Sequence, residues 1–210
     1  MKEKNKSKNI NNKIKLILLG ESDTGKTSLI NSYIGMEFKE HNITTISSNY
    51  ILKELVIDQV KYDIQIWDTA GQERFRSINK IFIKDSQIVI FVYDTTQKKT
   101  FNELDFWLKY TRNLLPPSTI FGIAGNKKDL LEEIKDEQKG EIVSEEEGKK
   151  YAEDNGALFS QTSAKDDREG FIEFVLELIK KFIEEQKDNE QQRESLLLNN
   201  SNKKKNKKFC

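Results

Sequence analysis

The stretch Gly20–Thr27, which reads GESDTGKT, decides the fold of this chain, because it fits the pattern Gly-x-x-x-x-Gly-Lys-Ser/Thr. Its two glycines allow the backbone to curl, so that successive N–H groups point at phosphate groups. A chance match is the alternative, but the loop lies between the apolar run Ile14–Leu19 and the helix-like segment Lys26–Ile34, the setting that the motif requires. The expected phosphate contacts are Gly20, Ser22, Asp23, Thr24, Gly25, Lys26, Thr27 and Ser28.

Within this loop two side chains have specific expected roles. Lys26 is expected to reach the β- and γ-phosphates of a nucleotide, and the Thr27 hydroxyl is expected to bind magnesium. The helix that begins near Lys26 adds the positive end of its dipole.

A second motif begins at Trp67 and reads WDTAGQE. Asp68 follows an apolar strand and is the expected second contact to magnesium, through water. The Gly71 N–H can approach a γ-phosphate, and the Gln72 amide is expected to orient an attacking water. Thr45, in an earlier loop, is a candidate for a further magnesium and γ-phosphate contact, with a loop residue of no role as the alternative. A surface turn with a chance Asp and Gln is the alternative for the whole motif.

Two later loops fit the recognition of guanine. Asn126-Lys127-Lys128-Asp129 follows an apolar strand, and the Asp129 carboxylate can accept hydrogen bonds from both N1–H and N2–H₂ of the base. Adenine lacks this donor pair, which would leave a buried carboxylate unpaired at a cost. Asn126 is expected to tie the base to neighbouring loops, and the stem of Lys127 to pack over the ring. Backbone N–H groups for the guanine oxygen are expected from Ser163, Ala164 and Lys165.

Composition limits the class of protein. The 210 residues suffice for one domain with tails, and 35 basic and 35 acidic side chains give a formal net charge of zero. This balance gives no global attraction to nucleic acid, so no nucleic-acid partner is expected. The single cysteine, Cys210, excludes an internal disulfide and favours a reducing compartment. No run approaches the roughly 20 apolar residues of a membrane-spanning helix, and a secretory signal is not evident.

Strand-like and helix-like segments alternate along the middle of the chain, which predicts an α/β fold with a mostly parallel sheet and helices on both faces. The runs Tyr50–Ile57 and Tyr62–Trp67 are separated by a few turn residues and predict one antiparallel hairpin. Further buried strands are expected over Ile14–Leu19, Ile88–Tyr93, Ile120–Ala124 and Ala157–Gln161. Helices are expected over Lys26–Ile34, Thr100–Leu115, Ser144–Asn155 (with Ser144 and Glu147 as a capping box) and Phe171–Ile183. All motifs then fall at the carboxyl ends of strands, where such sheets bind ligands.

With these motifs in this order, the chain from about Ile14 to Phe182 resembles the Ras superfamily of small GTPases. The stretch Gln65–Phe75 (QIWDTAGQERF) is similar to the Rab branch, which governs vesicle traffic. The resemblance implies a P-loop NTPase fold with a six-stranded sheet, one antiparallel hairpin and five helices. It also implies switch regions around Phe38–Ser48 and Gly71–Asn79, with Phe38 packed edge-on against guanine.

The same resemblance implies an effector surface made by Tyr50, Trp67 and Phe82, for which ordinary packing on the hairpin is the alternative. The chain departs from the Rab pattern at Ile46-Ser47, where Ile-Gly is usual, and at Tyr50, where Phe is usual. The segment Phe82–Ser86 (FIKDS) is most similar to the Tyr-Ile-Arg-Asp-Ser of the Golgi retrograde-traffic Rabs. These changes leave the nucleotide site intact and put the effector identity in doubt.

The resemblance implies a magnesium-dependent switch that binds and hydrolyses GTP and regulates vesicle trafficking by recruiting effectors. Hydrolysis is expected to be slow, because no residue is evidently placed as an arginine finger. The implied partners are an exchange factor, a GTPase-activating protein, effectors, a GDP-dissociation inhibitor and a prenylation escort protein. Two alternatives stay open: a binding module locked in one nucleotide state, opposed by the intact Gln72, and a small GTPase of another branch, opposed by Gln65–Phe75 and the missing Cys-a-a-X ending.

The two ends of the chain differ in composition from the middle. The expected organisation is a disordered basic extension (1–12), a GTPase domain (13–183) and a flexible hypervariable tail (184–210). Five lysines at 203–205 and 207–208 precede Cys210, and the resemblance implies prenylation of this cysteine, so that one lipid and a polybasic segment anchor the protein to a membrane surface. An unmodified thiol on a solvated tail is the alternative. The expected location is the cytoplasmic face of an intracellular membrane, with the Golgi as candidate, in exchange with the cytosol.

Overall fold

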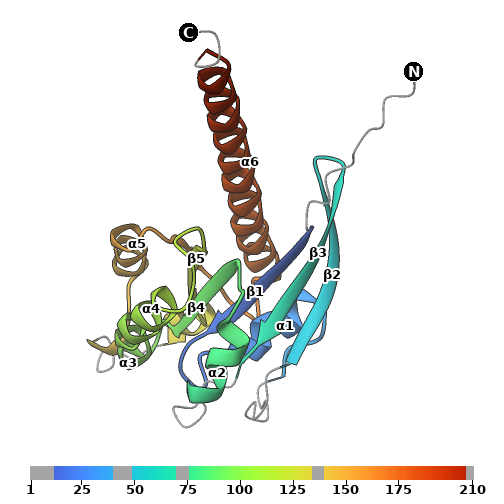
Figure 1. Cartoon of the computed structure of the whole chain (residues 1–210). Helices are drawn as coiled ribbons and strands as arrows, with labels where there is room; N and C mark the ends of the chain where they lie inside the picture. The colour runs from blue at the N-terminus through green and yellow to red at the C-terminus, as the bar shows by residue number, and fades with distance from the viewer. Residues whose placement is uncertain (1–11, 40–48, 70–75, 134–139, 207–210) are drawn as a thin grey trace.

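The computed structural model describes residues 12–39, 49–69, 76–133 and 140–206. A central sheet is flanked by helices, and one long helix projects from the domain to the C-terminal end (Figure 1). The elements in chain order are β1 (Lys13–Leu19), α1 (Lys26–Tyr33), β2 (Asn49–Ile57), β3 (Val60–Asp68), α2 (Arg76–Ile83), β4 (Ile88–Asp94), α3 (Lys98–Asn102), α4 (Leu104–Arg112), β5 (Ile120–Asn126), the 3₁₀ helix η2 (Lys128–Glu133), α5 (Glu145–Asp154), β6 (Leu158–Gln161) and α6 (Arg168–Asn206).

The six strands form one sheet in the order β2-β3-β1-β4-β5-β6. The pair β2–β3 is antiparallel and the other neighbours are parallel, as the sequence predicts. Asp58 and Gln59 form the tight turn of the hairpin with φ of 51° and 64°, and two successive positive φ values suit the right-handed twist of paired strands. The α/β fold class and the hairpin are therefore confirmed.

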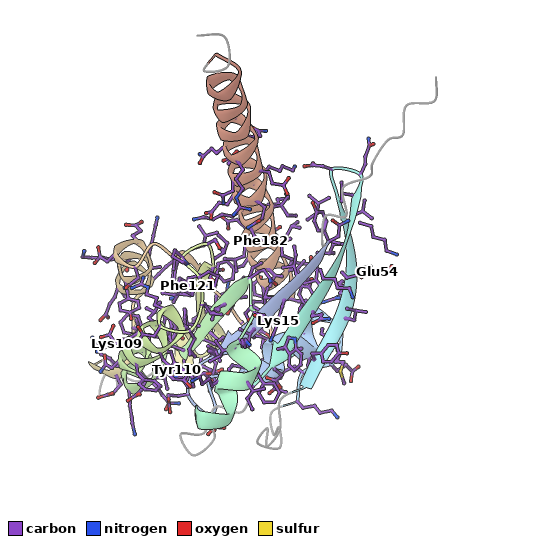
Figure 2. The ribbon with its side chains drawn as sticks, viewed as in Figure 1. Lys15, Glu54, Lys109, Tyr110, Phe121 and Phe182 are labelled. Carbon is purple, nitrogen blue, oxygen red and sulfur yellow. The ribbon has the colours of Figure 1, made fainter. Side chains whose placement is uncertain are left out.

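Two apolar clusters cover the two faces of the sheet. One joins the strands to α1 and α6, and the other joins them to α2, α3, α4 and α5. Phe182 lies against the first cluster and Phe121 against the second (Figure 2). Every residue of β4 is buried, because this strand lies in the middle of the sheet with helices on both sides. This burial fixes the end of β4, where Asp94 lies.

The predicted helix Thr100–Leu115 differs from the observed structure in its extent and continuity. The structure has two helices, α3 and α4, separated at Glu103, whose φ of −72° and ψ of −9° loosen the α-helical path. The described residues therefore contain six α-helices where the resemblance implied five. The N-cap of α5 is confirmed, since Ser144 Oγ accepts a hydrogen bond from Glu147 N at 3.1 Å.

The expectation that the last helix ends at Ile183 is wrong, because α6 continues to Asn206. The polarity of residues 184–206 argues against packing but not against a helix: they contain neither Gly nor Pro, and Glu, Gln, Lys and Leu are good helix formers. Lys187 Nζ also lies 3.0 Å from Asp58 Oδ2, which links the helix to the β2–β3 turn. In the part of the chain that the structure describes, none of the helices has the length and apolar character needed to cross a bilayer.

Candidate nucleotide-binding site

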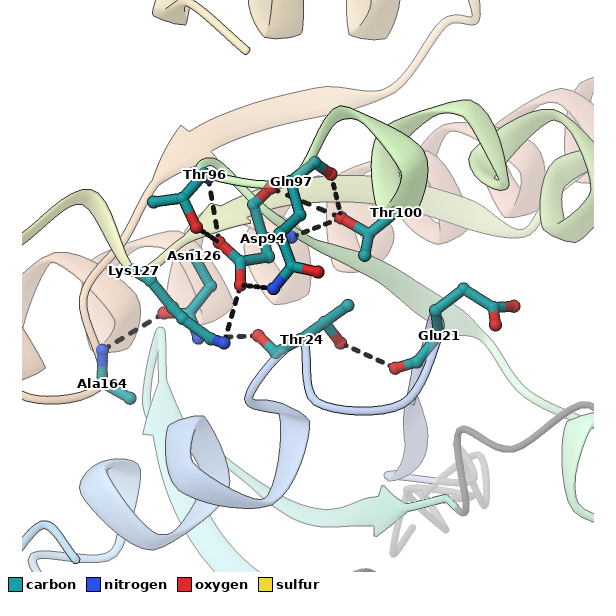
Figure 3. A network of polar contacts seen from close by, with 9 residues as sticks. All are labelled: Glu21, Thr24, Asp94, Thr96, Gln97, Thr100, Asn126, Lys127 and Ala164. Atoms are coloured by element: carbon teal, nitrogen blue, oxygen red, sulfur yellow. Dashed lines mark hydrogen bonds and ion pairs between the residues drawn. The ribbon is translucent and has the colours of Figure 1, made fainter. Parts of the chain in front are cut away.

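The sequence motifs meet at one edge of the sheet, beyond the carboxyl ends of β1, β3, β4 and β5. The phosphate loop follows β1, Asp68 ends β3, Asp94 ends β4, and Asn126 ends β5. Figure 3 shows how polar contacts from the middle strands converge beside the phosphate loop. This convergence is the expected position of a ligand site in an open α/β sheet.

The two motif glycines are required by close approach as well as by conformation. Gly20 has φ of 149°, and a Cβ there would lie 2.1 Å from Val92 O in β4. Gly25 has φ of 90°, and a Cβ there would lie 2.3 Å from Asn126 Nδ2. Asp23 adds a third positive φ of 63°, so that the loop curls back on itself before α1 begins. The loop shape predicted from the sequence is thus present.

Lys26 is buried beneath this loop. Its Nζ donates to Gly20 O at 3.0 Å and to Glu21 O at 2.7 Å. The residue is only 5% exposed. Burial lowers the pKa of Lys26 to about 8, and the nearby carboxylates of Asp68, Glu21 and Asp23 oppose this shift. A polyphosphate bound in the loop would supply the negative charge that this cation needs.

Thr27 and Asp68, 41 positions apart in sequence, are in direct contact. The Thr27 hydroxyl donates to Asp68 Oδ2 at 2.7 Å, and Asp68 is 8% exposed. A hydroxyl and a carboxylate are hard oxygen ligands, and Mg²⁺ ordinarily uses one or two protein oxygens together with phosphate oxygens and waters. No group of three His, Cys, Asp or Glu able to hold a metal occurs among the described residues. The hydroxyl and carboxylate oxygens of Thr27 and Asp68 fit magnesium held jointly with a nucleotide.

Asn126 joins the phosphate loop to the base-reading loops. Its Nδ2 donates to Thr24 O at 2.9 Å, and its Oδ1 accepts from Ala164 N at 3.2 Å and from Thr162 Oγ1 at 3.4 Å. The side chain is 1% exposed, so that these hydrogen bonds are made away from water. Figure 3 shows Asn126 between Thr24 and Ala164. The predicted role of Asn126 as a tie between loops agrees with this geometry.

The predicted base-reading carboxylate is held by the last motif. Ser163 Oγ donates to Asp129 Oδ1 at 2.6 Å. Ser163 Oγ also accepts hydrogen bonds from Lys165 N at 3.2 Å and from Asp166 N at 2.9 Å. Asp129 and the Ser163–Lys165 loop are therefore brought together as the sequence predicts.

Asp94 and Asp167 are site residues that the sequence reasoning missed. Asp94 Oδ2 lies 2.7 Å from Lys127 Nζ, and Asp167 Oδ2 is paired with Lys128 Nζ. Strand order is enough to place Asp94 beside the Asn126–Asp129 motif, because Asp94 ends β4 directly opposite Asn126 at the end of β5. The Asp167 contact has no comparable signal, since it depends on how the loop after β6 folds.

Other predicted residues lie at the edge of the description or outside it. Phe38 is 42% exposed in the segment that follows α1. Thr45, Gly71 and Gln72 lie outside the described residues, as does Cys210. Their expected roles stay predictions.

The three aromatic side chains of the predicted effector surface lie side by side, one on β2, one on β3 and one on α2. Tyr50 and Trp67 stack with ring centroids 4.8 Å apart, and Trp67 and Phe82 follow at 5.6 Å. Lys15 Nζ, labelled in Figure 2, lies 4.9 Å from the Trp67 ring, and burial lowers the pKa of Lys15. Tyr50 is 49% exposed while Trp67 and Phe82 pack partly against the core. The cluster is thus both a packing unit and an accessible aromatic patch.

Comparison with known proteins agrees with this geometry. The Ras family model matches residues 15–184. The Ras-related protein Rab-21 of Mus musculus is 38% identical over 170 residues, which cover 81% of this chain and 73% of that protein. Human Rab-21 gives the same identity, with 72% of its length covered. The putative Ras-related protein Rab-5B of Dictyostelium discoideum is 33% identical over 174 residues, which cover 82% of this chain and 77% of that protein.

The alternatives of another branch and of a nucleotide-locked binding module are not favoured by these relatives. The chain therefore belongs to the Ras family as a Rab-type small GTPase, a GTP-hydrolysing switch that regulates vesicle traffic and associates with intracellular membranes.

Proposed function

We propose that the loop from Gly20 to Ser28 binds the phosphates of GTP and GDP through its backbone N–H groups, with Lys26 on the β- and γ-phosphates. The observation that carries the proposal is the contact of Thr27 with Asp68, distant in sequence, next to the buried Lys26 at the strand ends. A buried lysine whose pKa is lowered gains most from a multiply charged anion, since the anion restores the charged form.

Thr27 would hold Mg²⁺ through its hydroxyl and Asp68 through a water, with Thr45 as a further ligand when GTP is bound. When bound, the ion supplies charge neutralisation between the phosphates. The chain contributes the two oxygens and their fixed separation: Thr27 lies in the first turn of α1 and Asp68 at the end of β3. Both elements pack against the core through their buried side chains, which would limit reorganisation on binding.

Asp129 would accept hydrogen bonds from the guanine N1–H and N2–H₂ groups, with Ala164 and Lys165 offering N–H groups to the guanine oxygen. The Ser163 hydroxyl donates to one oxygen of the carboxylate and so orients it, and both oxygens keep lone pairs that the base could use. Adenine lacks the donor pair, and the cost of leaving the half-buried Asp129 carboxylate unpaired against the base would select GTP over ATP. Lys127 and Phe38 would contact the ring from its face and its edge.

Gln72 would orient the attacking water, and Gly71 and Thr45 would contact the γ-phosphate through their N–H groups. Turnover is slow in this proposal, because an arginine finger must come from a GTPase-activating protein, worth on the order of 10³–10⁵ in rate. An exchange factor would reopen the site for GTP. The surface formed by Tyr50, Trp67 and Phe82 would then bind effectors, since aromatic side chains offer large contact area at low entropic cost.

The end of the chain would form the membrane anchor. Prenylation of Cys210 with the nearby lysines supplies the two signals that stable anchoring needs. A GDP-dissociation inhibitor and a prenylation escort protein would then act on this lipidated form. Placement on Golgi membranes rests on Phe82–Ser86 alone, and it is tested by imaging tagged protein beside Golgi and endosomal markers, with Cys210→Ser as the variant that should stay off membranes.

The test of the switch is nucleotide content and single-turnover GTP hydrolysis of the purified protein, with and without magnesium. Bound GDP and slow, magnesium-dependent hydrolysis that Gln72→Leu abolishes are expected. Gln186→Leu, an exposed position on α6, is the matched control and should hydrolyse GTP at the wild-type rate. Unchanged turnover in Gln72→Leu would contradict the role of Gln72, and a protein without guanine nucleotide would contradict the assigned site.

A further inference from the structure

Two consecutive lysines of the base-reading loop are each held by a carboxylate from another segment. Lys127 Nζ lies 2.7 Å from Asp94 Oδ2 at the end of β4, whereas Lys128 Nζ pairs with Asp167 Oδ2 just before α6. We propose that Asp94 and Asp167 are positioning residues for guanine recognition, which act through Lys127 and Lys128. The inference rests on the proposed role of the Asn126–Asp129 loop in reading the base.

The Asp94 carboxylate is held by hydrogen bonds that do not involve Lys127. Its Oδ1 accepts from Thr96 N at 2.9 Å and from Thr96 Oγ1 at 2.7 Å, and its Oδ2 accepts from Gln97 Nε2 at 2.9 Å (Figure 3). The side chain of Asp94 is 1% exposed, compared with 27% for Lys127. A buried carboxylate with fixed hydrogen bonds is a rigid anion, and the flexible lysine is therefore the partner whose position is determined.

The backbone of the loop needs this support. Lys127 has φ of 68°, in the left-handed region that non-glycine residues seldom adopt and that costs free energy. The strand register places Asp94 opposite Asn126, and Thr95 N donates to Asn126 O at 2.9 Å. The carboxylate is thus anchored to the same backbone that carries Lys127, so that the ion pair directs the lysine stem along the β4 side of the loop.

Asp167 supports the opposite side of the loop. Its Oδ1 accepts from Gly170 N at 3.0 Å, which fixes the carboxylate at the start of α6, and Lys128 N donates to Thr162 O at 3.1 Å. The hydrogen bond from Lys128 also lowers the pKa of Asp167, so that the pair stays charged at neutral pH. Asp129 follows Lys128 directly, and its carboxylate is therefore positioned by the Lys128–Asp167 pair together with Ser163.

The two pairs should affect recognition differently. In the proposed site the Lys127 stem would lie over the face of the ring, where it would not distinguish guanine from hypoxanthine, which lacks the 2-amino group. Asp129 would accept a hydrogen bond from that amino group and would therefore distinguish the two bases. Loss of the Asp94 contact should therefore weaken GDP and inosine diphosphate (IDP) alike, whereas loss of the Asp167 contact should reduce the preference for GDP.

The experiment measures dissociation rates of ribose-labelled fluorescent GDP and IDP from the full chain after a chase with unlabelled GDP. Asp94→Asn should raise both rates about tenfold, the effect of losing one hydrogen bond to a charged group. Asp167→Asn should lower the GDP preference at least about threefold. Asp154→Asn, in the exposed Lys150–Asp154 pair of α5, is the matched control and should leave both rates unchanged.

A double-variant cycle tests whether Asp94 acts through Lys127. In a Lys127→Gln background, Asp94→Asn should add no further acceleration. Additive effects, or wild-type rates in Asp94→Asn, would overturn the Asp94 assignment, and an unchanged GDP preference in Asp167→Asn would overturn that of Asp167. If Asp94→Asn does not fold, Thr96→Val removes one of the hydrogen bonds that orient Asp94 and should accelerate dissociation only when Lys127 is present.

Asp129→Ala separates this inference from the proposed function. If Asp129→Ala keeps the full preference for GDP over IDP, the loop does not read the base and the proposed role fails. If Asp129→Ala loses the preference while Asp94→Asn and Asp167→Asn behave as wild type, only the positioning inference fails.

Discussion

The phosphate half and the base half of the site are built by different means. The phosphate half is a single continuous loop, shaped by Gly20 and Gly25, with Lys26 bonded to the loop's own carbonyl groups. The base half is assembled from separate segments and is held by side-chain contacts between them, such as those of Asp129 with Ser163 and of Lys127 with Asp94. Charge on the phosphates can be met by backbone dipoles, whereas a base edge requires side chains at fixed positions.

The largest effect is expected from a substitution at the contact between Gly25 and Asn126, where the phosphate half meets the base half. Gly25→Ala would place a Cβ 2.3 Å from Asn126 Nδ2 at a φ of 90°. We expect the free energy of unfolding to fall by about 3 kcal/mol and nucleotide to be lost on purification. Denaturant unfolding and the nucleotide content of the purified protein measure both effects.

The matched control for Gly25→Ala is Gly156→Ala. Gly156 also has a positive φ, of 63°, but a Cβ there would meet nothing within 4 Å. Backbone strain alone should cost about 1 kcal/mol there and leave binding intact. Equal effects of the two substitutions would show that the Gly25–Asn126 contact is unimportant.

The next largest effect on GDP binding is expected from a substitution that changes only the phosphate half of the site. Lys26→Met removes the buried ammonium group while keeping most of the side-chain volume, and should weaken GDP binding at least about a hundredfold. The nucleotide-free protein should not lose stability, because the buried cation is disfavoured there and its pKa is lowered to about 8. Titration calorimetry and thermal unfolding measure the two quantities, with the exposed Lys109→Met as control. A parallel loss of stability and binding would contradict this separation.

A smaller effect tests the base half. Ser163→Ala deletes the hydroxyl that donates to Asp129 at 2.6 Å, and should weaken GDP binding about fivefold. Ser163→Thr keeps the hydroxyl and should restore most of the affinity. The measurement is the ratio of association and dissociation rates of labelled GDP. Equal weakening by both substitutions would point to a steric cause instead.

The smallest expected effect is a pH dependence that belongs to the phosphate half. Bound phosphates would keep Lys26 charged, whereas its pKa is about 8 without them. The affinity for GDP should therefore fall about fourfold from about pH 7 to about pH 8.5. Lys26→Arg, which does not titrate in this range, should flatten the profile; a profile that stays the same would assign the dependence to another group.

The same pKa has the opposite consequence for stability. The native pKa lies below the ordinary value of 10.5, so the unfolded chain binds more protons between about pH 8 and that value. Lys26 therefore makes the nucleotide-free protein more stable as pH rises through this window. Unfolding of wild type and Lys26→Met at both ends of the window checks the sign.

The long C-terminal helix extends beyond the end that the sequence predicts for it. Low hydrophobicity after Ile183 predicts a segment that does not pack and that is flexible or weakly ordered. The structure continues α6 to Asn206, because helix propensity depends on local residue types and does not require a buried face. The division of Thr100–Leu115 into α3 and α4 is a similar local detail that apolar periodicity does not resolve.

The sequence by itself determined the fold class, the strand hairpin and the residues of the phosphate loop, because each depends on the order and type of nearby residues. Tertiary structure decided which distant side chains meet: Thr27 with Asp68, Asn126 with Thr24, and the two lysines with Asp94 and Asp167. These contacts join segments as far as 102 positions apart, and their geometry is set by the buried sheet that brings the strand ends together. The types and order of nearby residues do not specify contacts between distant segments, which is why the carboxylate partners of Lys127 and Lys128 became visible only in the folded chain.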